Sequence, residues 1–600
     1  MMPADTVALY IPADHPIAPE IRYALEALLC AAGIPYHGCV EWPPAGAPPA
    51  SIAYLPAPPD ELPAGALVIR ADPAAAEVLR RPGAGQLPPP AYISHAGRRW
   101  PLPFGGPAEW DALVWLAQAR RERRLILPAD LPAAAFWVLS RWEEYAEGGR
   151  DDWGRFRYTA SWFAGGAEDM HVVDGYMMLL RDMLEGLAGG KLPRRPVWPD
   201  GAPFAFCVTH DIDSLCKWRP RRIVGELGYL RQAWRRDGPA SALRRLNETL
   251  HGLRERPNPH DNVLELAERE REAGIRATYF FLADHAHPQD GGYRLRPEGR
   301  PADIVRRTAE LGHEVALHGS FLTLGDAPRL ERERRMLEEI VGPLAGQRQH
   351  FLRFDIPASW EMYAALGFAY DSSLGFAERE GSRAGFSFPF FPYDFRRRRP
   401  YPCLEIPLTL MDATLYAYRR LSAAEARRAA EALIEHVAGV GGCFTLLWHN
   451  ATFDEADLPG WGALFWEIVE MARARRPWIA PLREVAGWWR EQAPPDSQHN
   501  KNCRGTASLY PYCVVTVGCM PRRACSTGSP ELGDLPPPAP TCANLPPPAP
   551  LVCEDLPPTG SPRMRRPAPP ACGGERTAMP WRAWPCPPPA PPELGGKGGS

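Results

Sequence analysis

A chain of 600 residues is longer than a single hydrophobic core usually holds, so we expect two or more domains. The formal net charge of -3 argues against a nucleic-acid binder that works through bulk charge. The first residues lack a charged leader with an apolar run, and no stretch reaches the roughly 18 apolar residues of a membrane helix. We therefore expect a cytoplasmic protein without a transmembrane segment.

Residues 1–110 have the pattern of a small α/β domain. An apolar strand at 7–11 precedes a helix at 19–33, with Pro19 in its first turn and Gly33 at its end. Residues 111–199 are predicted to be a helical connecting region that ends in a proline-punctuated linker. Further strands are expected at 51–55 and 66–70, and further helices at about 136–145 and 171–187.

Residues 200–493 alternate short apolar strands with helices, which implies parallel pairing through helical crossovers. A longer basic helical insertion, about 220–255, follows the first strand. The seven strand–helix units predict an α/β fold with an incomplete (β/α)7-type barrel, whose site residues lie at the carboxyl ends of the strands. The expected strands are 204–210, 277–282, 314–318, 351–354, 369–374, 404–410 and 443–448, and the expected helices are 261–273, 329–341, 359–366, 422–438, 461–474 and a last one containing Trp488 and Trp489.

Residues 494–600 differ in kind from the rest of the chain. Proline and glycine dominate, and Leu-Pro-Pro-Pro-Ala-Pro occurs at 535 and again at 545. Such a segment has too few apolar side chains to offset the entropy of ordering, so we predict a disordered tail. It holds eight of the 14 cysteines at irregular spacings, and we assign it no function.

The first barrel strand ends in two carboxylates, Asp211 and Asp213. Because side chains alternate along a strand, these two point the same way, whereas His210 points to the opposite face. Two like charges at this spacing repel unless a cation or a shared proton intervenes. A solvated Asp-x-Asp turn is the alternative for this stretch taken alone.

Other predicted strands end in polar residues as well. A lone histidine is more often a hydrogen-bonded structural residue than a ligand. Several such ends at one barrel face are harder to explain by solvation, because solvation does not require histidine and carboxylate together. The further strand ends are His318-Gly-Ser320, Arg353-Phe-Asp355, Asp371-Ser-Ser373 and Trp448-His449-Asn450.

At these motifs, residues 203 to about 490 resemble the polysaccharide deacetylase family, the carbohydrate esterases with NodB homology. The first motif of that family corresponds to Thr209-His-Asp-Ile-Asp213 and the second to Gly312-His-Glu-Val-Ala-Leu-His318-Gly-Ser. Arg353 begins the third, Asp371 stands where the fourth supplies an aspartate, and Leu447-Trp-His449 is similar to the closing motif. The segment 136–156 resembles the amino-terminal region that accompanies one bacterial branch.

The resemblance implies a role for each of these side chains. Asp213 and His318 would bind a divalent metal, most simply zinc, that polarises an acetyl carbonyl and acidifies a water. Asp211 would be the general base and His449 the general acid. Arg353 would keep Asp211 ionised by charge pairing, and Asp371 would orient His449.

One position departs from the family pattern. The second motif normally supplies two histidines four residues apart, and the position four after His318 is Leu322, which cannot bind a metal. The third ligand could come from His210, Ser320, Thr323 or a water, with His210 disfavoured by its strand face.

The sequence leaves three functions open. The first is a metal-dependent hydrolase that removes N-acetyl groups from an N-acetylated sugar or polysaccharide and releases acetate. The second, motivated by Leu322, is a catalytically silent barrel that binds a glycan or a partner. The third is a carbon–nitrogen hydrolase that acts on a small amide. The expected partner is a glycan substrate, with no nucleic acid, and the sequence does not identify a protein partner.

Overall fold

A computed structural model of the protein describes residues 6–492, apart from 45–47, 83–89, 105–108, 146–147, 166–169, 191 and much of 218–257. The tail that we predict to be disordered, 494–600, lies outside the described residues. Most of the predicted basic insertion, 220–255, does so too.

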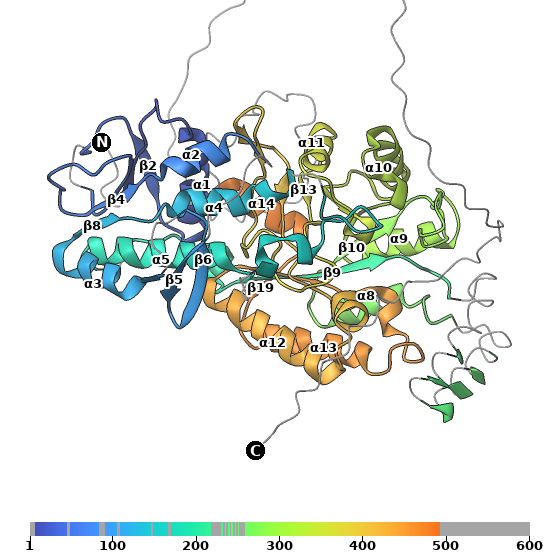
Figure 1. The fold of residues 1–600 in the computed structure, drawn as a ribbon. Coiled ribbons are helices and arrows are strands. Elements are labelled where there is room, and N and C mark those ends of the chain that lie inside the picture. Colours follow the sequence, from blue (N-terminus) through green and yellow to red (C-terminus); the bar gives the residue numbers. More distant parts are fainter. Residues whose placement is uncertain are drawn as a thin grey trace, which may run out of the picture. The chain divides into compact units, whose positions relative to one another are not determined.

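The amino-terminal region contains a parallel sheet with helices, as predicted (Figure 1). Its five strands run in the order β2-β1-β3-β4-β8. The sheet extends past residue 110, because its edge strand β8 comes from the stretch predicted to be helical. The strands are β1 (Val7–Tyr10), β2 (Tyr36–Cys39), β3 (Ser51–Leu55), β4 (Ala66–Arg70) and β8 (Arg124–Leu127), and the helices are α1 (Ala18–Ala31), α2 (Pro73–Leu79), α3 (Ala112–Glu122), α4 (Leu131–Leu139) and α5 (Val172–Leu187). A small second sheet is formed by β5 (Ala91–His95), β6 (Arg98–Leu102) and β7 (Glu109–Asp111).

The second half of the described chain forms an open parallel barrel. Its strands follow the order β16-β13-β12-β11-β10-β9-β18-β17, and β19 pairs with β9. The two end strands are not neighbours in this order, which leaves the barrel incomplete, as predicted. All eight residues of β9 are buried, as expected for a parallel strand covered on both faces. The strands are β9 (Ala205–Ile212), β10 (Thr278–Leu282), β11 (Glu314–Gly319), β12 (Gly346–Gln349), β13 (Tyr370–Asp371), β16 (Leu404–Glu405), β17 (Leu410–Met411), β18 (Cys443–Leu447) and β19 (Trp478–Ile479).

Helices connect the barrel strands, and α12 packs against α13 (Figure 1). Ser422 and Glu425 form a capping box at the start of α12. The sequence pattern missed α9, which lies between β10 and β11. The helices are α8 (Val263–Glu272), α9 (Arg300–Glu310), α10 (Ala327–Val341), α11 (Ala358–Ala365), α12 (Ala423–Val440), α13 (Trp461–Arg473) and α14 (Leu482–Gln492).

Two predicted strands are wrong in position. The strand expected at 351–354 is replaced by β12, which ends earlier, at Gln349. Phe351 and Leu352 have positive φ angles of 63° and 53°, which a strand does not allow. The strand expected at 404–410 is two short strands, β16 and β17, at opposite ends of the sheet. Both differences change which side chains reach the carboxyl edge of the barrel.

The amino-terminal region contacts the barrel through buried polar groups. Asp174 on α5 accepts hydrogen bonds from the backbone N–H and the hydroxyl of Ser387, at 2.8 and 2.5 Å. The hydroxyl of Tyr23 on α1 donates to the carbonyl of Phe391 at 2.8 Å. All described residues belong to one compact unit, so their division into domains at 110 and 199 stays a prediction.

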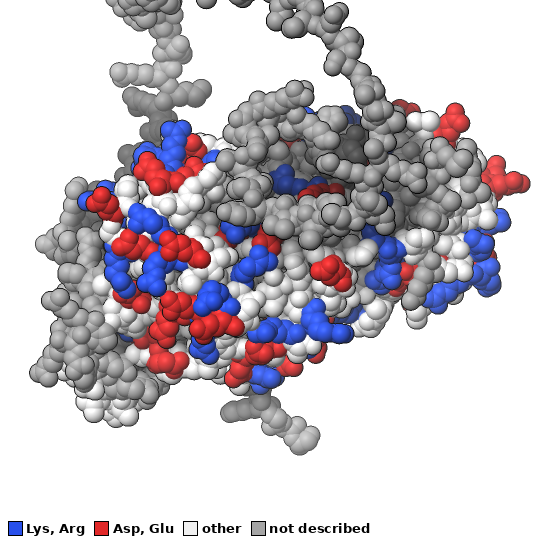
Figure 2. Space-filling view, turned by 180° about the vertical axis from the view of Figure 1, so that it is seen from behind, with Lys and Arg blue, Asp and Glu red and all other residues white. Residues whose placement is uncertain are grey.

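Within the described part of the chain, no helix combines the length and the apolar character needed to cross a membrane. Figure 2 shows Lys and Arg side chains interspersed with Asp and Glu over the face that it draws. Such mixing gives no single-sign field on that face.

Candidate metal centre

Histidines and carboxylates from neighbouring parallel strands meet at the carboxyl edge of the barrel. Asp211 lies near the end of β9, and Asp213 follows that strand. His318 lies near the end of β11, His350 directly follows β12, and His449 follows β18. Because the carboxyl ends of parallel strands share one edge of the sheet, residues far apart in sequence are brought together here.

Asp213, His318 and His350 form a compact group of three possible metal ligands. The Oδ1 atom of Asp213 lies 3.3 Å from Nε2 of His318 and 3.5 Å from Nε2 of His350. All three ligand atoms fall within 4.8 Å of one another. Among the described residues, Asp213 Oδ1 and His318 Nε2 are buried atoms without a hydrogen-bond partner. Buried polar atoms are rarely left unsatisfied, so this donor set fits a divalent cation.

The imidazole rings of His318 and His350 are each held by a contact at Nδ1, the nitrogen that points away from Asp213. Nδ1 of His318 lies 3.0 Å from the carbonyl oxygen of Arg348, which can only accept a hydrogen bond. Nδ1 of His350 lies 3.4 Å from Oδ1 of Asp290. When Nδ1 donates outward, the lone pair of Nε2 points into the site, which is the usual arrangement of metal-binding histidines.

Asp211 lies at the same edge and is held by an arginine. The guanidinium of Arg348 donates to Asp211 Oδ1 at 2.9 Å and to the Thr209 hydroxyl at 2.8 Å. The Oδ2 atom of Asp211 lies 3.6 Å from Nε2 of His318. Arg348 is fully buried, so its charge acts on Asp211 with little screening.

The predicted pairing of Arg353 with Asp211 is wrong. Arg353 donates from Nε to the carbonyl of Trp153 at 2.7 Å, and its guanidinium lies 3.9 Å from the centre of the Phe321 ring. Strand β12 ends five residues earlier than the sequence pattern indicates, so Arg348 takes the position expected for Arg353.

His449 is oriented by Asp412. Its Nδ1 lies 2.7 Å from Asp412 Oδ1, and its backbone N–H donates to Asp412 Oδ2 at 2.8 Å. Its Nε2 is 3.7 Å from Asp213 Oδ2, so the ring faces the candidate ligands. Burial alone would lower the pKa of His449, but the carboxylates of Asp412 and Asp213 outweigh it and raise that pKa to about 10.

The prediction that Asp371 orients His449 is therefore wrong. Asp371 is buried between strands, where its oxygens accept hydrogen bonds from the backbone N–H and hydroxyl of Ser373, at 3.1 and 2.6 Å. Burial raises its pKa. Asp412 follows β17, whose Met411 lies beside Leu447 of β18, and this pairing places it next to His449.

His350, the candidate third ligand, was not predicted from the sequence. Leu322 is 38% exposed on a short turn after β11. His210, Ser320 and Thr323, the side chains proposed in its place, form hydrogen bonds with other residues. His350 has the required position instead. Its signal was the polar run before Phe351, which the apolar-strand pattern passed over. The other contacts are His210 Nδ1 with Trp448 O and Nε2 with Glu270 Oε1, both at 2.7 Å, the Ser320 hydroxyl with Glu333 at 2.5 Å, and the Thr323 hydroxyl with Ser320 O at 2.8 Å.

The charges around Asp213, His318 and His350 favour the binding of a cation. Loss of water raises the pKa of Asp213, but the imidazoles of His350 and His318 outweigh this and hold it well below its usual value. Burial lowers the pKa of His350, but Asp213 and Asp290 raise it to about 9. A divalent cation held by this group would neutralise the negative charge of Asp213.

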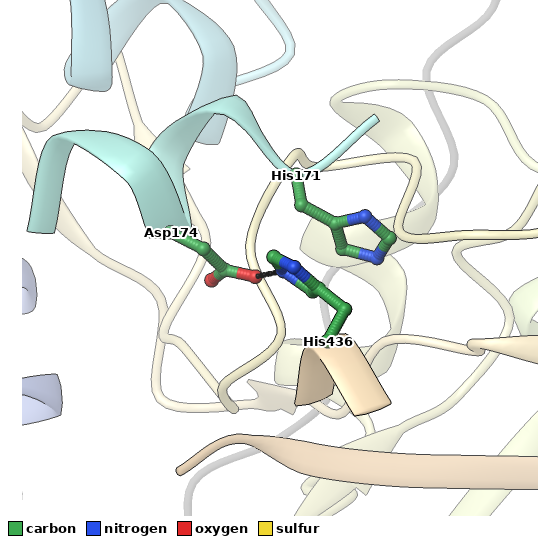
Figure 3. A group of neighbouring side chains, drawn as sticks. All are labelled: His171, Asp174 and His436. Carbon is green, nitrogen blue, oxygen red and sulfur yellow. Dashed lines mark hydrogen bonds and ion pairs between the residues drawn. The ribbon is translucent and has the colours of Figure 1, made fainter. Parts of the chain in front are cut away.

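Two further groups of the same residue types occur in the described chain. In the first, Nε2 of His436 on α12 lies 2.9 Å from Asp174 Oδ2 (Figure 3). Nδ1 of His436 lies 2.7 Å from the Arg98 guanidinium. The ring of His171 lies 4.1 Å from that of His436, centre to centre. In the second, Lys217 already supplies the positive charge between two aspartates. That group is His260, Asp454 and Asp457, with Lys217 Nζ 2.5 Å from Asp454 and 3.1 Å from Asp457.

Residues 101–188 match a family of unknown function (DUF7033). Over half its length the chain matches solved structures of polysaccharide deacetylases and an allantoinase. One, described as a polysaccharide deacetylase from Mycobacterium smegmatis, is 21% identical and is matched over 50% of this chain and 95% of its own, with a TM-score of 0.34. The Puue allantoinase is 15% identical, covers 50% of this chain and 95% of its own, and also has a TM-score of 0.34.

A third structure, described as a polysaccharide deacetylase from Pseudomonas aeruginosa PAO1, is 15% identical and covers 51% of this chain and 97% of its own, again with a TM-score of 0.34. No curated protein matches the chain. At these TM-scores the functional argument rests on the geometry of the site itself.

Proposed function

We propose that the chain is a metal-dependent hydrolase that removes N-acetyl groups from an N-acetylated sugar or polysaccharide and releases acetate. The observation that carries this proposal is the pair of buried, unsatisfied atoms that face each other, Asp213 Oδ1 and His318 Nε2. Asp213, His318 and His350 would hold the cation. When bound, a metal such as zinc polarises the acetyl carbonyl and acidifies a water.

The remaining side chains supply a matched base and acid. Asp211, paired with Arg348, takes a proton from the attacking water as the new carbon–oxygen bond forms. His449 donates a proton to the departing sugar nitrogen as the carbon–nitrogen bond breaks, which leaves acetate and a free amine. Asp412 holds Nδ1 of His449, so that the proton transferred comes from Nε2.

The catalytically silent alternative was motivated by Leu322. His350 weakens that motive, because it offers a third ligand atom to the same group as Asp213 and His318. A binding module also has no need of an acid and a base on either side of one cation. The small-amide alternative uses the same chemistry and differs only in the substrate.

The direct experiment is acetate release from N-acetylglucosamine oligomers by zinc-loaded protein. We expect acetate in proportion to free amine, and no acetate after the metal is removed with a chelator. Zinc-loaded protein that binds the oligomers but releases no acetate would favour the silent barrel. Hydrolysis of a small cyclic amide, with the oligomers untouched, would favour the third function.

A further inference from the structure

A loop from outside the barrel, Arg150–Phe156, forms a rigid turn. An isolated β-bridge joins its two ends, Arg150 and Phe156. The carboxylate of Asp151 accepts the backbone N–H groups of Trp153 and Arg155, both at 2.9 Å. These contacts fix the turn that carries Trp153 at its tip.

Arginines tie this loop to the barrel just after His350. Arg150 donates to the carbonyl of Phe354 at 3.1 Å, and Arg155 donates to the carbonyl of Phe351 at 3.4 Å. From the barrel, Arg353 donates to the carbonyl of Trp153 at 2.7 Å. The loop is therefore held against the segment that follows a candidate metal ligand.

Trp153 lies within an aromatic group beside the candidate ligands. Its ring stacks on Phe351 at 5.5 Å and 29°, and it meets Phe321 edge-on at 6.0 Å. Phe351 directly follows His350, and their ring centres are 4.5 Å apart. Phe321 comes three residues after His318. Trp153, Phe321 and Phe351 are each only half-buried. The Phe321 ring is covered by the Arg353 guanidinium at 3.9 Å and by the stacked His287 ring at 4.1 Å, so Phe321 supports Trp153 and offers no open face of its own.

We propose that Trp153, supported by Phe321 and Phe351, binds the pyranose ring of the N-acetylated sugar, so that the amino-terminal region completes the substrate site. This proposal rests on the proposed function. A sugar ring has an apolar C–H face that packs on an aromatic ring, whereas a small amide has no such face. The aromatic group therefore favours a sugar over a small amide.

Arg353 contacts two residues of this aromatic group. It donates to the carbonyls of Trp153 and Phe321 and covers one face of the Phe321 ring at 3.9 Å. It holds the two aromatic residues in place without touching Asp211. Arg353 is thus a positioning residue for the aromatic group.

The test compares Trp153→Ala with Trp153→Phe, which keeps an aromatic face. With an N-acetylglucosamine tetramer we expect KM to rise about tenfold in the alanine variant and little in the phenylalanine variant. Metal content should stay at the wild-type level in both. Trp466→Ala, at a half-buried tryptophan on α13, is the matched control and should leave KM unchanged. If Trp153→Ala fails to fold, Trp153→Leu keeps the bulk without the aromatic face.

Calorimetric binding of the tetramer separates this inference from the proposed function. If the wild type binds the tetramer and Trp153→Ala binds it at least about tenfold more weakly, the inference holds even when no acetate is released. If Trp153→Ala and Trp153→Leu bind the tetramer as tightly as the wild type, the inference is overturned. A wild type that does not bind the tetramer overturns it as well.

Discussion

The barrel group (Asp213, His318 and His350) and the group of Figure 3 (His171, Asp174 and His436) contain the same residue types, yet their surroundings differ. In the barrel group, Asp213 Oδ1 and His318 Nε2 lack hydrogen-bond partners among the described residues. In the group of Figure 3, Asp174 accepts from Ser387 and lies 2.9 Å from His436, which is also bonded to Arg98. A cation would bind the two atoms that lack hydrogen-bond partners in the barrel group. In the group of Figure 3 it would have to displace Arg98 from His436.

The comparison shows that residue type alone does not define a metal site. The barrel histidines direct Nδ1 outward, to Arg348 O and Asp290, and keep Nε2 for the site. His436 has both nitrogens engaged by its neighbours. We therefore assign the group of Figure 3 a structural role, in which Asp174 joins α5 to the barrel and to α12.

The largest effect is expected from Asp213→Asn, which removes the only carboxylate of the barrel group. Without that charge two neutral imidazoles bind a divalent cation poorly. We expect the purified variant to contain no stoichiometric metal and to release no acetate, as measured by elemental analysis and an acetate assay. Metal content equal to that of the wild type would contradict the assignment of this group.

His449→Ala separates the acid from the ligands. We expect kcat to fall about a hundredfold or more, because the departing amine loses its proton donor, while metal content is unchanged. Elemental analysis and initial rates on the same sample give both values. Loss of the metal in this variant would mean that His449 is a ligand rather than the acid.

His350→Ala sharpens the comparison, because it tests a ligand that the sequence did not reveal. We expect the metal dissociation constant to rise about a hundredfold or more, since the site loses one of three protein ligands. Adding Leu322→His, at the position where the resembled family supplies its second histidine, should recover much of the affinity. A competition titration with a metal-sensitive dye measures both.

The matched control for this pair is Leu322→His in the wild-type background, which should bind metal at least as tightly as the wild type. If His350→Ala binds metal as tightly as the wild type, His350 is not a ligand.

Much of this arrangement was predictable from sequence, because apolar runs mark the strands and the chemistry lies where they end. Asp211, Asp213, His318 and His449 all follow or end apolar strands, and the structure brings them together. Arg348 and His350 were missed for one reason. Strand β12 is polar, because Gln347 and Arg348 face hydrogen-bond partners inside the barrel, so a pattern based on apolar residues skipped it.

The choice between Asp371 and Asp412 could not be made from sequence either. Asp371 ends the short strand β13 and Asp412 follows the short strand β17, so only the order of strands in the sheet decides which lies beside His449. Strand β17 pairs with β18, whereas β13 lies far from it in that order. Sheet order depends on long-range packing, which the local sequence pattern does not record.

The central claim is that the barrel group binds a metal ion and the group of Figure 3 does not. Metal stoichiometry in paired variants tests this claim most directly. The wild type, His318→Ala and His436→Ala would be loaded with zinc, dialysed and analysed for bound metal. We expect about one ion per chain in the wild type and in His436→Ala, with a lower melting temperature in the latter, and almost none in His318→Ala. Loss of the ion in His436→Ala with retention in His318→Ala would contradict the account.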